Sequence, residues 1–116
     1  GELVTVPLVE GLTQALSGFE NHGGGTVLGP DAAPLGRVVS GVGNGTPQGR
    51  QPADVAYDGA VQGSIIATYM HGPALARNPE LADLLLTRAT GMELEPLEVP
   101  GVAELRAQRL SGVQLP

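Results

Sequence analysis

Runs of apolar residues divide the first two thirds of the chain into short strand candidates. Residues 3–8 alternate β-branched and other side chains, and residues 35–40 form a second short run. Residues 64–70 are almost continuously apolar or β-branched, which is typical of a strand buried on both faces of a parallel or mixed sheet. A weaker run at 53–57 is expected to be the returning strand of a hairpin.

Helical spacing appears after residue 78. Asn78 is an N-cap candidate, Pro79 suits the first helical position, and leucines recur at helical spacing until Gly91, a candidate C-cap glycine. We therefore predict a helix between Asn78 and Gly91. A second amphipathic stretch at 102–110 predicts either a surface helix or a disordered tail.

Two glycine-rich segments, 18–26 and 41–51, separate these elements and are predicted to be turns or mobile loops. Glycine-rich loops also cradle phosphates through their backbone N–H groups. Neither segment contains a G-x-x-x-x-G-K-[ST] motif, and the chain has no lysine to reach a phosphate. Turns that need positive φ are the commoner explanation.

Composition excludes several classes of function. The 116 residues carry a formal net charge of −6, with six arginines scattered singly and aromatic residues at 3%. There is no basic patch to neutralise phosphates and little aromatic surface for base stacking, which argues against a nucleic-acid partner. No apolar run is long enough to span a membrane, so we expect a soluble protein. Cysteine is absent, which excludes disulfides and a cysteine nucleophile within these residues.

Both histidines, His22 and His71, lie in loops beside glycines, and His71 follows the apolar run at 64–70. Sites in open α/β sheets gather at the carboxyl ends of strands, which places His71 well for chemistry, although a histidine there can equally be a hydrogen-bonded structural residue. The two histidines with Glu20 could form a zinc-type site. No ligand spacing such as H-x-x-x-H supports it, so we predict no metal site.

Several short strings occur in an order that resembles one enzyme family. They are F-E-N-H-G-G at 19–24, P-L-G at 34–36, G-N-G at 43–45, T-Y-M-H-G-P at 68–73 and R-N-P-E-L-A-D at 77–83. Together they resemble the CobB/CobQ-type class I glutamine amidotransferases. The resemblance covers about residues 3–90, so we expect 1–90 to be the C-terminal half of such a domain and 91–116 a tail that contains a possible short helix.

The resemblance implies a flavodoxin-like, doubly wound α/β domain. In this family a cysteine on a strand-to-helix turn attacks the side-chain amide of glutamine. His71 matches the catalytic histidine, which would hold the thiolate and then protonate the departing ammonia. Glu20, Asn21, His22 and Gly23 match the segment beside the glutamine pocket and are carried over as substrate-binding residues. The alternative is a loop that merely braces the strand leading to His71.

The sequence departs from the complete family pattern in two ways. No cysteine is present and the chain begins directly in a strand, so we expect that the N-terminal half is missing and that these residues are inactive alone. Many class I amidotransferases carry H-x-E, but Pro73 stands at the glutamate position. The resemblance implies that a partner subunit supplies this carboxylate.

Within the family, the chain resembles the amidotransferase subunits of lipid II isoglutaminyl synthases. This implies a bacterial, cytoplasmic glutaminase in a heterodimer with a Mur-ligase-like synthetase of the MurT type, which amidates D-glutamate of lipid II in peptidoglycan synthesis. ATP and magnesium would belong to that partner, with no cofactor in this chain. The alternatives are a cobyric or cobyrinic acid amidotransferase domain, or a non-catalytic binding module with the same fold.

Overall fold

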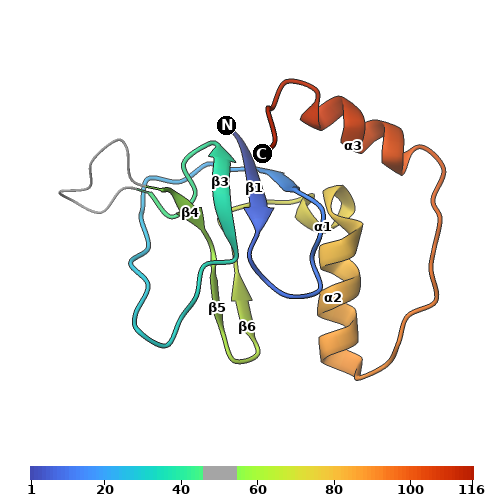
Figure 1. Cartoon of the computed structure of the whole chain (residues 1–116), viewed down its shortest axis with the longest axis horizontal. Helices are drawn as coiled ribbons and strands as arrows, with labels where there is room; N and C mark the ends of the chain where they lie inside the picture. Colours follow the sequence, from blue (N-terminus) through green and yellow to red (C-terminus); the bar gives the residue numbers. More distant parts are fainter. Residues whose placement is uncertain (46–54) are drawn as a thin grey trace.

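The computed structural model describes residues 1–45 and 55–116, and its main feature is a four-stranded antiparallel sheet (Figure 1). The strands are β1 (Glu2–Pro7), β2 (Leu16–Phe19), β3 (Gly36–Ser40) and β4 (Tyr57–Asp58), in the order β2-β1-β3-β4. A separate antiparallel hairpin is formed by β5 (Ala60–Gln62) and β6 (Ile65–Ala67). The chain thus combines sheets with helices, as in an α/β domain.

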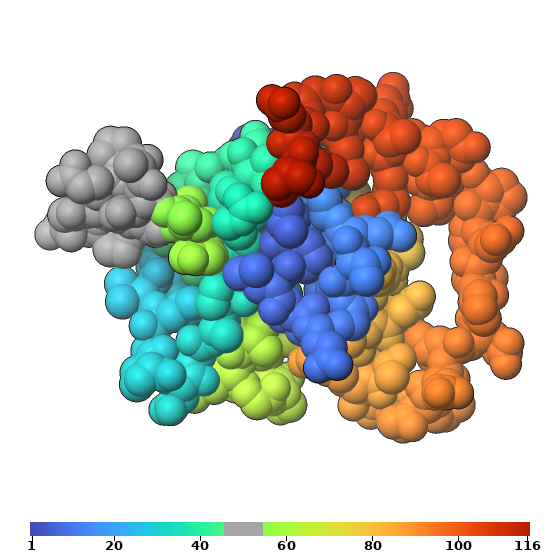
Figure 2. Space-filling model, viewed as in Figure 1, coloured from blue at the N-terminus to red at the C-terminus, as the bar shows by residue number. Residues whose placement is uncertain are grey.

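Three helices follow the strands: α1 (Ala74–Arg77), α2 (Pro79–Thr90) and α3 (Val102–Leu110). Helix α1 packs against β2, the edge strand of the sheet, and continues into α2 after Asn78. Between α2 and α3 the chain stands out from the body of the protein, as Figure 2 shows, and Leu97 in this segment is 85% exposed. In the described parts, 1–45 and 55–116, no helix has the length and apolar character needed to cross a membrane.

The core lies between the sheet and α2. Its buried members are aliphatic side chains from both sides, namely Leu3, Leu12, Leu16, Leu35, Met70 and Leu81. Leu3 comes from β1, Leu16 from β2 and Leu81 from α2, so the sheet and the helix bury these side chains against each other. Met70, which directly precedes His71, belongs to this core and is 6% exposed. His71 therefore directly follows a residue that is buried in the core.

The predicted strands at 3–8 and 35–40 are confirmed as β1 and β3, and the amphipathic stretch at 102–110 is a helix. The predicted helix after Asn78 is confirmed as α2, which begins at Pro79 and ends at Thr90, followed by the C-cap Gly91 with a left-handed φ of 69°. Asn78 holds the N-cap position, but its side chain makes no capping bond. It bonds instead to the backbone of β2.

The prediction of a doubly buried strand at 64–70 is wrong. Only Ile65–Ala67 is a strand, it pairs antiparallel with β5, and Ile65 is 65% exposed. The pattern misled because the two-stranded hairpin buries only one face: Ile65 faces solvent, Ile66 is partly buried against the core, and only Met70 is buried in it. Local β propensity does not distinguish these two environments.

Strand β2 was missed, since Gly18 and Phe19 were assigned to the glycine-rich loop at 18–26. Glycine is disfavoured in strands, but it is needed here because a Cβ on Gly18 would lie 2.6 Å from Met70 Cβ. Of the hairpin strand predicted at 53–57, residues 53 and 54 lie outside the described residues, and Tyr57 begins β4 opposite Arg37. The predicted loop at 41–51 likewise extends beyond them.

Candidate functional site

His71 is held beside the end of β2 by its own backbone. Its N–H donates to the carbonyl of Phe19 at 2.7 Å, which extends the pairing of β2 by one isolated bridge. The exposed imidazole then turns toward the loop that follows β2, and its Nε2 lies 3.2 Å from the carbonyl oxygen of Asn21. A carbonyl oxygen only accepts hydrogen bonds, so this contact places the proton on Nε2 and makes Nδ1 the basic atom of the neutral ring.

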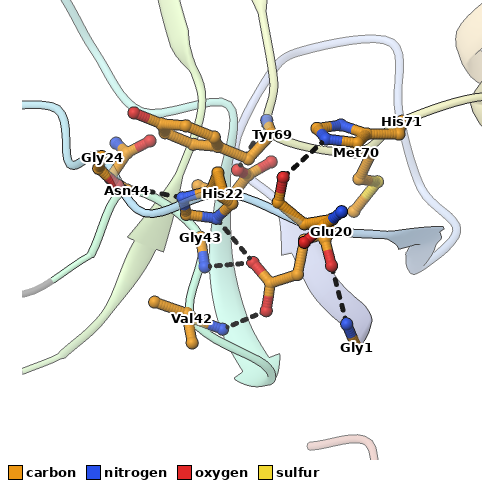
Figure 3. Close-up of polar contacts among 12 residues, drawn as sticks. Gly1, Glu20, His22, Gly24, Val42, Gly43, Asn44, Tyr69, Met70 and His71 are labelled. Carbon is orange, nitrogen blue, oxygen red and sulfur yellow. Dashed lines mark hydrogen bonds and ion pairs between the residues drawn. The ribbon is translucent and has the colours of Figure 1, made fainter.

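Glu20 carries a buried carboxylate, and its residue is 6% exposed. Oε1 accepts the backbone N–H of Val42 at 2.6 Å, and Oε2 accepts that of Gly43 at 2.9 Å (Figure 3). Oε2 also lies 3.1 Å from His22 Nε2. Burial works to raise the pKa of Glu20, but the bonds from Gly43, Val42 and His22 outweigh it and lower the pKa below 4.5.

Both ring nitrogens of His22 face acceptors. Nδ1 lies 2.9 Å from the carbonyl oxygen of Gly24, and Nε2 contacts Glu20. Only the imidazolium form donates from both nitrogens, and these two contacts, the Gly24 carbonyl first, raise the pKa of His22 above 6.5. The ring also stacks on Tyr69, with centroids 3.9 Å apart and planes inclined by 25° (Figure 3). When His22 is protonated, it therefore forms an ion pair with Glu20 against an aromatic face.

The segment that leads to His71 is fixed by Asp58, which is fully buried at the end of β4. The Asp58 carboxylate accepts the Thr68 hydroxyl at 2.5 Å and the Tyr69 N–H at 3.1 Å. Thr68 Oγ1 in turn accepts the N–H of Met70 at 3.0 Å. Burial raises the pKa of Asp58, while the Thr68 and Tyr69 bonds act in the opposite direction. Two of the three residues before His71 are therefore bonded to one carboxylate.

The structure brings four of the five residues predicted for the site together: His71, Glu20, Asn21 and His22 lie within a few hydrogen bonds of one another. Gly23 is exposed, and a Cβ built there would meet nothing within 4 Å, so sterics do not require glycine. In 1–45 and 55–116, no group of three or more acidic, histidine or cysteine side chains is arranged to hold a metal ion.

Sequence reasoning missed Asp58 and the amide donors of Val42 and Gly43. Asp58 lies next to a glycine in a segment with no recognisable motif, so nothing in the sequence pointed to it. Gly43 was visible in the G-N-G string, and its φ of 62° explains the glycine, but the donor role of its N–H depends on where Glu20 lies. Thr68 and Tyr69 belong to the T-Y-M-H-G-P string at 68–73, but the sequence alone assigned no structural role to them.

Comparison with known proteins adds independent information. Residues 3–79 match the CobB/CobQ-like glutamine amidotransferase domain. The chain is 36% identical over 96 residues to the lipid II isoglutaminyl synthase (glutamine-hydrolyzing) subunit GatD of Staphylococcus aureus (strain N315), which covers 80% of this chain and 36% of that relative. It is 32% identical over 103 residues to the subunit GatD of Streptococcus pneumoniae (strain ATCC BAA-255 / R6), covering 88% and 37% respectively.

A shorter similarity links the chain to a probable cobyric acid synthase of Methanothermobacter thermautotrophicus, with 44% identity over 59 residues, or 51% of this chain and 10% of that relative. The chain thus spans little more than a third of the two GatD relatives. The family match covers the strands, the Glu20–His22 loop and His71, and it confirms the resemblance seen in the sequence. The chain belongs to the CobB/CobQ-like glutamine amidotransferase family.

Proposed function

We propose that this chain is the His71-bearing part of the glutamine-hydrolysing subunit of a lipid II isoglutaminyl synthase, with His71 as its general base and acid. The observation that supports this most directly is the imidazole of His71, which is exposed and held through Nε2 on the Asn21 carbonyl. A base must be oriented and accessible to act on substrate, and this ring is both. The similarity to two GatD subunits supports the choice of reaction.

In this proposal a cysteine outside these residues attacks the carboxamide carbon of glutamine, since the chain contains no cysteine. Its proton passes to His71, and the imidazolium returns a proton to the departing amide nitrogen, which leaves as ammonia. Water then attacks the thioester carbonyl while His71 takes its proton, the C–S bond breaks, and glutamate is released as the departing thiolate recovers the proton from His71. These residues alone are therefore expected to be inactive. The remainder of the domain would complete the flavodoxin-like architecture expected from the family.

A second part of the proposal concerns the partner subunit that would use the ammonia. GatD is named as a subunit, so we propose a heterodimer with a Mur-ligase-like synthetase of the MurT type, which would bind ATP and magnesium and use the ammonia to amidate D-glutamate of lipid II in the cytoplasm. In residues 1–45 and 55–116, no carboxylate contacts the His71 ring, and Pro73 stands where other class I enzymes have glutamate. We propose that the partner supplies this carboxylate. Residues 1–90 then form the C-terminal half of the amidotransferase domain, and 91–116 its tail.

A second candidate, a cobyric acid amidotransferase, is supported by the 44% identity to the probable cobyric acid synthase. That match covers 10% of the relative, so most of the cobyric acid synthase lies outside it. The length of the full protein encoded by the gene discriminates between the two candidates. A separate subunit of the size of GatD supports the first, and fusion to a long synthetase domain supports the second.

The test of the reaction is ammonia release from glutamine by the full-length protein with its neighbouring synthetase. His71→Ala is expected to lower kcat by a factor of about 10³ or more, as for other nucleophile and base pairs. Arg109→Ala, on the surface of α3, is the control and should retain wild-type activity. Undiminished ammonia release by His71→Ala would refute the assignment.

A further inference from the structure

Glu20 and His22 flank Asn21, whose main-chain carbonyl contacts the His71 ring. We propose that these two side chains form a clamp that holds this carbonyl in place, and that they are positioning residues for His71 and not contacts for glutamine. The proposal rests on the function proposed above and changes the role that the family resemblance suggested for them. We call Glu20, His22 and their bonding partners the Asn21 clamp.

The clamp fixes the backbone on both sides of Asn21. A backbone carbonyl can orient a neighbouring ring only if the peptides around it cannot rotate. Glu20 is bonded to two amide groups of the loop after β3, at 2.6 and 2.9 Å. His22 is bonded to Gly24 and to Glu20, which closes the short loop on itself. The Asn21 peptide lies between two anchored residues, and its oxygen points at His71 Nε2.

The same clamp also reaches the segment that carries His71. His22 stacks on Tyr69, two residues before His71, and the Tyr69 N–H is held by the buried Asp58 carboxylate. The Tyr69 hydroxyl is paired with that of Thr26 at 2.8 Å, which fixes the far end of the ring. Tyr69 therefore contacts the loop that carries Asn21 and lies in the segment that carries His71. This ring holds the two segments together, so the distance between the Asn21 carbonyl and His71 Nε2 does not depend on loop motion.

Neither clamp residue has polar atoms left for a substrate. Both oxygens of Glu20 accept hydrogen bonds, and its side chain is 7% exposed. Both nitrogens of His22 face protein acceptors, and its side chain is 12% exposed. A residue that binds glutamine directly must offer a donor or acceptor toward the pocket. Instead, the polar atoms of both side chains are bonded to groups of the protein itself, as the dashed lines in Figure 3 show.

The experiment compares Glu20→Gln and His22→Phe with a matched control, Glu80→Gln, in the full-length protein with its synthetase. Glu80 is a second carboxylate that accepts two backbone N–H groups, those of Thr13 and Gln14, together with the Thr13 hydroxyl. Its bonds go to a different loop, so Glu80→Gln removes the same kind of interaction without touching the Asn21 carbonyl. His22→Phe keeps the stack on Tyr69 and removes both donors.

The two clamp variants are expected to lower kcat about tenfold to 100-fold, because a displacement of about 1 Å in a catalytic group has effects of that size. KM for glutamine should stay within about twofold of wild type, since the clamp makes no substrate contact. Glu80→Gln should retain wild-type kcat. A raised KM with unchanged kcat in His22→Phe would overturn the proposal, and so would an equal loss of kcat in Glu80→Gln.

A second readout does not require activity. In ¹⁵N spectra of the histidine rings, the His71 signal, assigned by its loss in His71→Ala, should show an Nε2-protonated tautomer in the wild type and a tautomer mixture in Glu20→Gln. An unchanged His71 tautomer in both clamp variants contradicts the clamp. If the wild-type protein releases no ammonia but the tautomer responds as expected, the proposed function fails and the positioning role stands.

Discussion

Asn78 is the residue whose replacement tests the packing of β2 against the helices most sharply. It is 1% exposed, and its side-chain amide acts as a bridge between elements. Oδ1 accepts the N–H of Ser17 at 2.8 Å, and Nδ2 donates to the carbonyls of Ser17 at 2.8 Å and Ala74 at 2.7 Å. Ser17 lies on the edge strand β2 and is itself 3% exposed. The amide therefore completes the outer side of β2 as a neighbouring strand would.

Asn78→Ala removes three hydrogen bonds to backbone groups, two buried and the one to Ala74 partly buried, and a longer contact from Arg106 at 3.4 Å. At about 1 kcal/mol for each of the three backbone bonds, we expect a loss of about 3 kcal/mol in the free energy of unfolding. Asn78→Asp has almost the same shape and keeps the acceptor for the Ser17 N–H. Its second oxygen, however, replaces a donor that faced two carbonyls, while Arg106 Nη1, 3.4 Å from Oδ1, offsets part of this loss. At neutral pH we therefore expect a loss of about 2 kcal/mol. Protonation at low pH would restore one donor and reduce this loss.

The measurement is urea unfolding of the full-length protein, followed by far-UV circular dichroism, for both variants at neutral and acidic pH. Asn21→Ala is the matched control, because Asn21 is exposed and the same truncation there should change the unfolding free energy by less than about 0.5 kcal/mol. The reasoning fails if Asn78→Asp is as stable as wild type at neutral pH, or if Asn78→Ala costs no more than the control.

Further predictions concern the segment before His71, the close contact at Gly18, the attachment of α3 and the pH dependence of the Asn21 clamp. Thr68→Val removes the hydroxyl shared by Asp58 and the Met70 N–H and should cost about 1–3 kcal/mol in thermal unfolding, whereas Thr68→Ser, which keeps the hydroxyl, should lose much less. Gly18→Ala places a Cβ 2.6 Å from Met70 Cβ. This overpacking should lower the free energy of unfolding by about 1–3 kcal/mol, and it should reduce ammonia release because it moves His71. A variant with the wild-type melting temperature and activity would contradict the contact. Arg106 donates to the carbonyls of Ala15 and Arg77, so Arg106→Ala should release α3 and speed hydrogen exchange and proteolysis in 101–116, while unchanged rates would show that α3 is held by other contacts. The contribution of the Glu20 carboxylate to the unfolding free energy is lost as pH falls below 4.5 through its lowered pKa, and that of the His22 imidazolium is lost as pH rises above 6.5 through its raised pKa. The difference in unfolding free energy between wild type and His22→Phe should therefore be largest between these limits and smaller on both sides. A difference that does not change with pH would refute the ion pair.

Local chemistry in the sequence was sufficient for much of the fold and for the candidate residues. Proline at the first helical position and glycine after the last turn determine where α2 begins and ends, because these residues act through backbone geometry and do not depend on distant contacts. The short runs of β-branched and apolar residues were likewise enough to predict β1 and β3. The order of short strings was enough to select the family and His71, and the family match confirmed the former.

Other features depended on which segments meet in three dimensions. Glycine at position 18 looked like a loop residue, but pairing with Leu3 of β1 places it in a strand, and the approach of Met70 explains why it is glycine. The apolar run at 64–70 looked buried, but burial depends on whether a second layer covers the hairpin. Glu20, Asp58 and Asn78 acquire their roles from partners 22, 10 and 61 positions away. Hydrogen bonds of that range are set by packing, so only the tertiary structure could reveal the clamp around Asn21 and the orientation it imposes on His71.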